Sequence, residues 1–313
     1  MQVMVAESAG FCYGVKRAVD MARETAKKCR HSVMLGSIIH NANVVAELEA
    51  LGMRKVDSWD QVRPGETVVI RSHGERKEVF DRLTAMGAAC VNATCPNVLR
   101  IQQLVAQAQE EGRTPLIIGE MHHPEVLGAA SWSERSVILP GPRELENWLN
   151  EEPSRRNMPL TATAQTTCVQ GIWESSKEIL KKQCTNAKIF DTICNATHRR
   201  QTEAAELAAQ VDVMVVVGDR KSANTKHLAE ICREKCGRVV QIERAGELSS
   251  ELFEGCLVAG LTAGASTPAG IIKEVYTTMS EEIKNMESNE ESFEELLEKS
   301  FKTLNTGEKV TGI

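Results

Sequence analysis

The 313-residue sequence lacks the marks of a secreted or membrane protein. No apolar run approaches the roughly 18 residues of a membrane-spanning helix, and the N-terminus has no charged, apolar and small-residue leader. We therefore expect a cytoplasmic protein, in a reducing compartment, that does not contact membranes. In that setting its ten cysteines indicate buried thiols, metal ligands or catalytic groups rather than a disulfide framework.

An excess of one charge is also missing from most of the chain. Residues 279–300 hold eight acidic residues and two lysines, a net charge of −6. The remainder holds 35 acidic and 35 basic residues, because the totals are 43 and 37. Charge therefore gives no reason to expect nucleic acid as a partner of this chain. With 42% hydrophobic residues, the chain can bury a large core and should form two or three domains.

Three cysteines share one spacing, because each lies 28 residues before a polar motif. The pairs are Cys12 and His40, Cys95 and His123, and Cys194 and Ser222. Around the cysteines, GFCYGV, NATCPN and TICNAT each end an apolar run and open a helical pattern. We interpret them as an internal threefold repeat. Three thiolates near one axis suggest an iron-sulfur cluster that is held by three ligands and leaves one iron open for substrate.

Short apolar segments of strand length alternate with helical segments along the chain, as in parallel α/β sheets. The apolar runs VMVVV and PLIIG suit strands that are covered on both faces. Nine strand ends carry polar motifs, in three sets that each begin with one of the cysteines. Ligands of such sheets bind beyond the carboxyl ends of the strands. The sequence therefore predicts three similar α/β units with parallel-rich sheets around a pseudo-threefold axis, a trefoil with a central cleft.

We place the unit boundaries at the cysteines. The predicted units span 1–94, 95–193 and 194–278, with the N-terminal strand and the Cys12 loop in the first unit. Residues 279–313 are expected to form an acidic tail or linker. Their end, GEKVTGI, resembles the opening strand of an OB-fold repeat that is cut short, and a plain disordered end is the alternative. A longer chain with such repeats would bind single-stranded RNA, whereas the present chain is not expected to bind nucleic acid.

Polar side chains at the strand ends are candidates for binding an anion. The imidazole donors are His40, His73 and His123. The donors at helix starts are Ser222, Asn224 and Ser266. The second group either caps helices or joins backbone N–H groups in holding a phosphate. Such a pocket of mostly neutral donors suits a diphosphate, and the GxxxxGK[ST] phosphate loop is absent from the sequence.

Glu125, Thr166 and Thr167 are candidates for proton transfer. Glu125 follows a proline in the first turn of an expected helix, where a carboxylate ordinarily serves the helix dipole. Because it is close to His123, it is also the best candidate for a general acid. The two threonines are either ordinary strand residues or groups that relay a proton and hold a substrate oxygen. The other seven cysteines lack partners at zinc-finger spacing and are expected to be structural or surface thiols.

Together the nine motifs resemble those of the LytB-type 4-hydroxy-3-methylbut-2-enyl diphosphate reductases. The matching segments, over about residues 1–278, are AGFCYGVKRAV, LGSIIHN, VIRSHGE, NATCPNV, HHPEV, QTT, DTICNAT, GDRKSANT and LTAGASTP. The resemblance implies a 4Fe-4S cluster held by Cys12, Cys95 and Cys194. It implies a diphosphate site formed by His40, His73, His123, Ser222, Asn224, Ser266 and the backbone N–H of Ala223. Glu125 would deliver protons, and Thr166 would hydrogen-bond the substrate hydroxyl with Thr167 beside it.

The resemblance also implies the reaction. Two electrons, from a flavodoxin or ferredoxin, and protons would remove the allylic hydroxyl, giving isopentenyl diphosphate, dimethylallyl diphosphate and water in the non-mevalonate isoprenoid pathway. Two positions depart from the family pattern: Ala223 replaces a usual serine, and Asn195 a frequent aromatic residue. The alternatives are a metal-dependent hydrolase of a phosphorylated substrate, with metal on the three histidines, and a non-catalytic phosphate-binding module. Neither alternative gives the three cysteine motifs a role.

Overall fold

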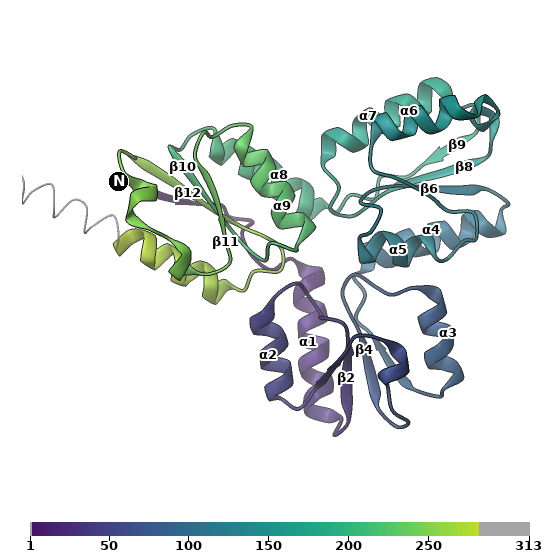
Figure 1. Ribbon diagram of the computed structural model, residues 1–313, viewed down its shortest axis with the longest axis horizontal. Helices are drawn as coiled ribbons and strands as arrows, with labels where there is room; N and C mark the ends of the chain where they lie inside the picture. Colours follow the sequence, from purple (N-terminus) through teal and green to yellow (C-terminus); the bar gives the residue numbers. More distant parts are fainter. Residues whose placement is uncertain (1, 282–313) are drawn as a thin grey trace, which may run out of the picture.

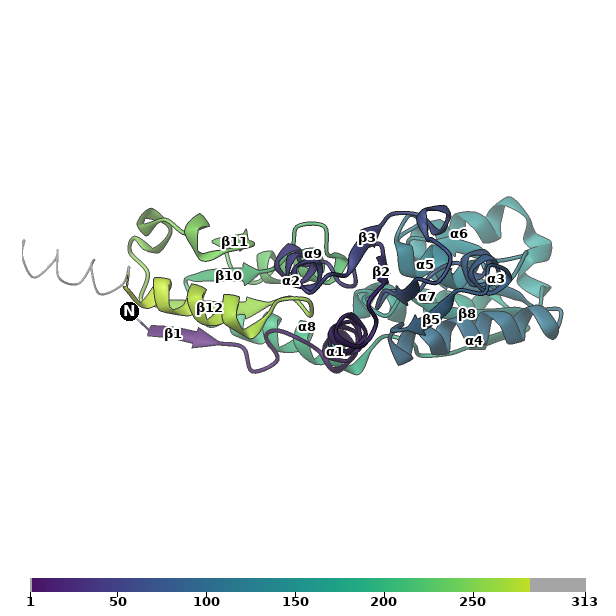
Figure 2. The ribbon, with the colours of Figure 1, turned by 90° about the horizontal axis from the view of Figure 1, so that it is seen from below.

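The structure, a computed structural model, describes residues 2–281, which form three α/β units arranged as a trefoil (Figure 1). Each unit has one four-stranded sheet, and the strand pairings are parallel. Seen from the side, the trefoil is flat (Figure 2). The predicted trefoil of three α/β units is confirmed. Most of the expected acidic tail, including its OB-fold-like end, lies outside the described residues.

The first two units follow the same order of elements, except that the second has an additional helix, α6 (Pro142–Glu151), before its third strand. The first sheet has the order β3-β2-β4-β5, with β2 (Ser32–Leu35), β3 (Arg54–Val56), β4 (Thr67–Ile70) and β5 (Ala89–Asn92). Its helices are α1 (Tyr13–Lys28), α2 (Ala42–Ala50) and α3 (Lys77–Ala85). The second sheet has the equivalent order β7-β6-β8-β9, with β6 (Thr114–Ile118), β7 (Val137–Leu139), β8 (Leu160–Ala164) and β9 (Ala187–Ile189). Its helices are α4 (Pro96–Glu110), α5 (Pro124–Ala130), α6 (Pro142–Glu151) and α7 (Gln170–Gln183). Short 3-10 helices cover Trp59–Gln61 and Pro153–Asn157.

The third unit takes its fourth strand from the start of the chain. Its sheet has the order β1-β12-β10-β11, with β1 (Gln2–Val5), β10 (Val213–Val217), β11 (Val239–Ile242) and β12 (Val258–Ala263). Its helices are α8 (Asn195–Ala208), α9 (Ala223–Arg233) and a last helix over 269–281, with 3-10 turns at Ala245–Glu247 and Ser250–Phe253.

The placement of β1 corrects the expected first unit, which began at residue 1. In the other two units, the fourth strand leads directly into a cysteine, from β5 to Cys95 and from β9 to Cys194. The strand before Cys12 must occupy the equivalent position if the repeat closes into a ring, and that position is in the third sheet. β1 accordingly pairs with β12, from Gln2 opposite Val258 onward.

Strand β10 is apolar and buried on both faces, because helices cover both faces of its sheet. In β10, Val213, Val215 and Val217 pack on the side of the last helix, while Met214 and Val216 pack against α8 and α9. This alternation follows from the two-residue period of a strand. Among residues 2–281, no helix is both long and apolar enough to cross a membrane.

Candidate active site

One pocket at the centre of the trefoil is lined by all nine strand-end motifs. It encloses about 690 Å³ of space between atoms, part of it open to solvent. Every candidate site residue lines it: Cys12, His40, His73, Cys95, His123, Glu125, Thr166, Thr167, Cys194, Ser222, Ala223, Asn224 and Ser266. The outer strands β3, β7 and β11 carry no such motif. The predicted central cleft is therefore present, and it lies at the carboxyl ends of the nine strands that carry these motifs.

Each of the three cysteines occupies the N-cap position of a helix. Cys12 precedes α1, Cys95 precedes α4 and Cys194 precedes α8, and none of these thiols makes a side-chain cap bond in the described structure. The backbone N–H groups of the cysteines donate to equivalent loops, namely to Ala265 O (3.4 Å), Ser72 O (2.9 Å) and Thr166 O (3.0 Å), respectively. Each of the three cysteines therefore lies at the N-terminus of a helix, where first-turn N–H groups and the helix dipole interact favourably with an anionic group.

Contacts between units bring the three thiols toward one another. Gly14 lies so close to the thiol of Cys95 that a Cβ at this position would be 2.6 Å from Sγ. Asn97 Nδ2 donates to Cys194 Sγ at 3.1 Å. Burial raises the pKa of Cys95 to about 11, and the neighbouring thiolates of Cys12 and Cys194 act in the same direction. Metal binding would displace the proton of such a thiol.

His40, His73 and His123 form a row on one side of the pocket. The ring centroids of His40 and His73 are 4.7 Å apart, and those of His73 and His123 are 5.7 Å apart. Burial lowers the pKa of all three rings, that of His73 well below its usual range and that of His123 to about 4. His123 Nδ1 accepts the backbone N–H of Glu125 at 3.1 Å, which leaves its proton on Nε2. The row therefore offers neutral N–H donors, as the sequence indicated.

Glu125 is buried beside Thr166, two residues after His123 in sequence and in the same pocket as the three histidines. The carboxyl group is 2% exposed and accepts the backbone N–H of Thr166 at 2.6 Å and its hydroxyl at 2.8 Å. Burial raises the pKa of Glu125 to about 7, although both hydrogen bonds from Thr166 act to lower it. A carboxyl group with this pKa is available both as an acid and as a base near neutral pH.

Two of the remaining polar side chains, Asn224 and Ser266, are buried and have polar atoms without hydrogen-bond partners among the described residues. Asn224 is 5% exposed, and neither its Nδ2 nor its Oδ1 has a hydrogen-bond partner within the described residues. The same holds for Ser266 Oγ, in a side chain that is 7% exposed. Ser222 caps α9 by accepting the N–H of Thr225 at 3.4 Å, so the capping interpretation applies to Ser222. Buried polar atoms without partners point to a polar ligand in the pocket.

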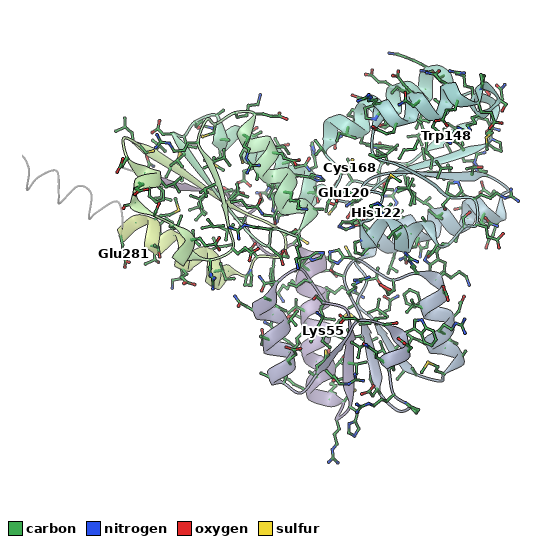
Figure 3. All side chains as sticks on the ribbon, viewed as in Figure 1. Lys55, Glu120, His122, Trp148, Cys168 and Glu281 are labelled. Atoms are coloured by element: carbon green, nitrogen blue, oxygen red, sulfur yellow. The ribbon has the colours of Figure 1, made fainter. Side chains whose placement is uncertain are left out.

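Several residues near the pocket had no role in the sequence-based prediction. His227 contacts Thr167 O through Nδ1 at 2.8 Å and Glu120 Oε1 through Nε2 at 3.7 Å. Figure 3 shows Glu120 at the inner end of the second unit, near the neighbouring third unit.

Cys168 is buried in the core of the second unit. All ten cysteines are free thiols, and within the described part of the chain no three His, Cys, Asp or Glu side chains converge on a single metal ion.

Comparisons with known proteins agree with the resemblance read from the motifs. A family model described as LytB protein matches residues 3–280. The 4-hydroxy-3-methylbut-2-enyl diphosphate reductase of Caldanaerobacter subterraneus subsp. tengcongensis is 38% identical over 300 residues, which cover 93% of this chain and 100% of that protein. A solved structure of (E)-4-hydroxy-3-methyl-but-2-enyl diphosphate reductase, at 35% identity, covers 90% of this chain and 100% of that chain with a TM-score of 0.65. The solved E-1-hydroxy-2-methyl-but-2-enyl-4-diphosphate reductase of Plasmodium falciparum, at 23% identity, shares the fold with a TM-score of 0.82 over 88% of this chain and 87% of that chain.

Proposed function

The chain belongs to the LytB protein family, and we propose that it reduces 4-hydroxy-3-methylbut-2-enyl diphosphate in the non-mevalonate isoprenoid pathway. Two electrons and two protons replace the allylic hydroxyl group with hydrogen. One proton leaves with the hydroxyl oxygen as water, and the other adds to either end of the allyl system, giving isopentenyl or dimethylallyl diphosphate. The observation that carries the proposal is that one pocket is lined by three thiols at helix N-cap positions, a buried carboxyl group and a row of neutral imidazoles.

Enzymes of this family contain a 4Fe-4S cluster, and we assign Cys12, Cys95 and Cys194 as its ligands, with one iron left open. The residues fit such a group. Three thiols are the donor set that an iron-sulfur cluster prefers, each begins a helix whose N–H groups favour a thiolate, and Gly14 leaves space for the sulfur of Cys95. When bound, the cluster would supply the electrons and a Lewis acid for the hydroxyl oxygen.

The side chains without partners form the other end of the pocket, and we assign them to the diphosphate. Asn224 and Ser266 would gain the partners that they lack, because phosphate oxygens accept from amide and hydroxyl groups. The neutral N–H groups of His40, His73 and His123 add donors without fixed charge, and the N-terminus of α9 adds the backbone N–H of Ala223. Hydrogen bonds to an ionised phosphate are stronger than hydrogen bonds between two neutral groups.

Glu125 and Thr166 are the proposed proton path. The carboxyl group of Glu125 is protonated below pH about 7 and can deliver that proton through the Thr166 hydroxyl, which lies 2.8 Å away. Thr166 is bound to the carboxylate by both its N–H and its hydroxyl, so the two groups are held as one unit. Thr167 lines the pocket next to them.

No observation in the pocket favours the hydrolase alternative. The three histidines do not converge on a single metal ion with any other ligand side chain among residues 2–281. The flavodoxin or ferredoxin donor and the cytoplasmic location stay predictions from the sequence.

The activity is tested with anaerobically purified protein, the allylic diphosphate substrate and reduced methyl viologen as the electron source. We expect oxidation of the dye to accompany formation of isopentenyl and dimethylallyl diphosphate. Cys95→Ser should abolish both the dye oxidation and the product formation. Release of inorganic phosphate without dye oxidation would instead show a hydrolase and overturn the proposal.

A further inference from the structure

Arg200 is a buried cation on the helix that follows Cys194. It lies six residues after that cysteine, in the second turn of α8, and is 3% exposed. Its Nε and Nη2 donate to Ser8 O at 3.0 and 2.7 Å, and Nη2 also donates to Gly10 O at 2.9 Å. The guanidinium group therefore ties the third unit to the loop that carries Cys12.

The positive charge of Arg200 has no carboxylate partner. Among residues 2–281, no Asp or Glu forms an ion pair with it, and the nearby carboxylate of Glu203 accepts hydrogen bonds from Glu7 and Ser8 instead. Burial lowers the pKa of Arg200, and the thiolates of Cys12 and Cys194 are the foremost charges opposing that effect. A buried charge without a counter-charge is strongly unfavourable. The sulfurs of Cys12 and Cys194 are therefore the candidate anionic partners of this guanidinium group.

One nitrogen of Arg200 is also left without a hydrogen bond. Nη1 is buried, and no acceptor reaches it within the described residues. Backbone carbonyls satisfy the other two nitrogens, so the unsatisfied atom belongs to the same group that lacks a counter-charge. An anionic hydrogen-bond acceptor beside Arg200 would supply both the missing counter-charge and the missing hydrogen bond.

The repeat shows that helix packing does not require an arginine here. The equivalent positions, six residues after Cys12 and Cys95, are Ala18 and Ile101. Both are fully buried, at 0% exposure, in the cores of their units. Only the third unit buries a charge at this position, at a cost that the other two avoid. The difference indicates a role that depends on the cation itself.

We propose that Arg200 is a positioning residue for the iron-sulfur cluster, holding the Cys12 loop against α8 and favouring the reduced cluster through its charge and free Nη1 hydrogens. The inference rests on the proposed function, because it needs the cluster at Cys12, Cys95 and Cys194. Reduction by one electron makes the cluster more negative. Hydrogen bonds and positive charge near the sulfurs raise the reduction potential of such clusters. Arg200 would thus make the cluster easier for a donor to reduce.

The test is a redox titration of the anaerobically purified, cluster-containing enzyme, followed by the spectrum of the reduced cluster. We compare Arg200→Met and Arg200→Gln, which remove the charge, with Arg200→Lys, which keeps it. The matched control is Arg199→Gln, because Arg199 is the adjacent, exposed arginine and its ion pair among residues 2–281 is with the exposed Glu7. Iron content is measured for every variant, so that the potential is compared at equal cluster occupancy.

We expect the two neutral variants to shift the reduction potential to more negative values, with a smaller shift for Arg200→Lys and none for the control. Should Arg200→Met fail to fold, Arg200→Gln carries the same comparison, since its amide can still donate to Ser8 O. Full iron content with an unchanged potential in a neutral variant would overturn the role of Arg200 and leave the proposed function intact. Absence of a cluster from the unsubstituted enzyme would overturn both.

Discussion

The buried carboxyl group of Glu125 makes the stability of the protein depend on pH. Its pKa rises from the ordinary 4.5 to about 7 on folding. The shift of about 2.5 units corresponds to about 3 kcal/mol, at about 1.4 kcal/mol per unit. Because the folded pKa is the higher one, the folded state binds the proton more tightly. The associated stability is fully present below pH about 4.5, is lost as the pH rises through about 7, and changes little above that.

Glu125→Gln removes this titration while keeping the shape of the side chain. We expect urea unfolding of the cluster-free proteins to give different pH dependences of the free energy of unfolding. From pH 5 to pH 8, the unsubstituted protein should lose most of about 3 kcal/mol relative to the Gln variant. The control is Glu146→Gln on α6, where the carboxylate is exposed. A stability difference that is the same at both pH values would refute the buried, proton-binding state of Glu125.

The same substitution tests the catalytic role. A general acid contributes about 10²- to 10⁴-fold to rate, so Glu125→Gln should lower kcat by about that factor with a smaller effect on KM. In the unsubstituted enzyme, kcat/KM should decrease above pH about 7, where the carboxyl group loses its proton. Full activity of the Gln variant would exclude Glu125 as the acid.

Three further substitutions are expected to act on single parts of the pocket. Thr166→Val removes a hydrogen bond that lowers the pKa of Glu125, so the alkaline decrease of kcat/KM should move to higher pH; an unmoved profile would contradict the pairing. Gly14→Ala would put a Cβ 2.6 Å from a proposed ligand sulfur and should lower the iron content, whereas Gly171→Ala, with nothing within 4 Å, should not. Asn224→Ala removes a hydrogen bond to a charged group, of about 1.5–3 kcal/mol, and should raise the Kd for the diphosphate substrate roughly 10- to 150-fold; calorimetry showing unchanged binding would remove Asn224 from the site.

The repeat made much of the fold predictable. The equal spacing from each cysteine to its polar motif, and the nine strand ends in three sets, were enough to predict the three parallel units and the central cleft. The exception was the N-terminal strand. Its pairing with β12 joins residues more than 250 positions apart in sequence, from Gln2 to Val258. Local sequence carries no signal for such a pairing, although closure of the repeat into a ring would have required it.

The candidate site was predictable where its residues follow strand ends. Asn97, Arg200 and His227 were missed because each acts across a boundary between units, on Cys194, on the Cys12 loop and on Thr167. Such contacts depend on the reach of side chains after the units have packed. Asn97 and Gly14 lie inside quoted motifs, two residues after a cysteine. This shared position was the feature of the sequence that could have identified Asn97 and Gly14 as neighbours of the cysteines.

The central claim is that three thiols from three units hold one cluster, and iron and sulfide analysis tests it most directly. The protein is purified without oxygen, alongside Cys12→Ser, Cys95→Ser and Cys194→Ser and the control Cys184→Ser, which alters a cysteine at the end of α7. We predict about four irons and four sulfides per chain, with visible absorption near 400 nm, in the unsubstituted and control proteins, and a large loss in each of the other three. An iron-free protein after anaerobic reconstitution, or a cluster that survives all three substitutions, would contradict the account.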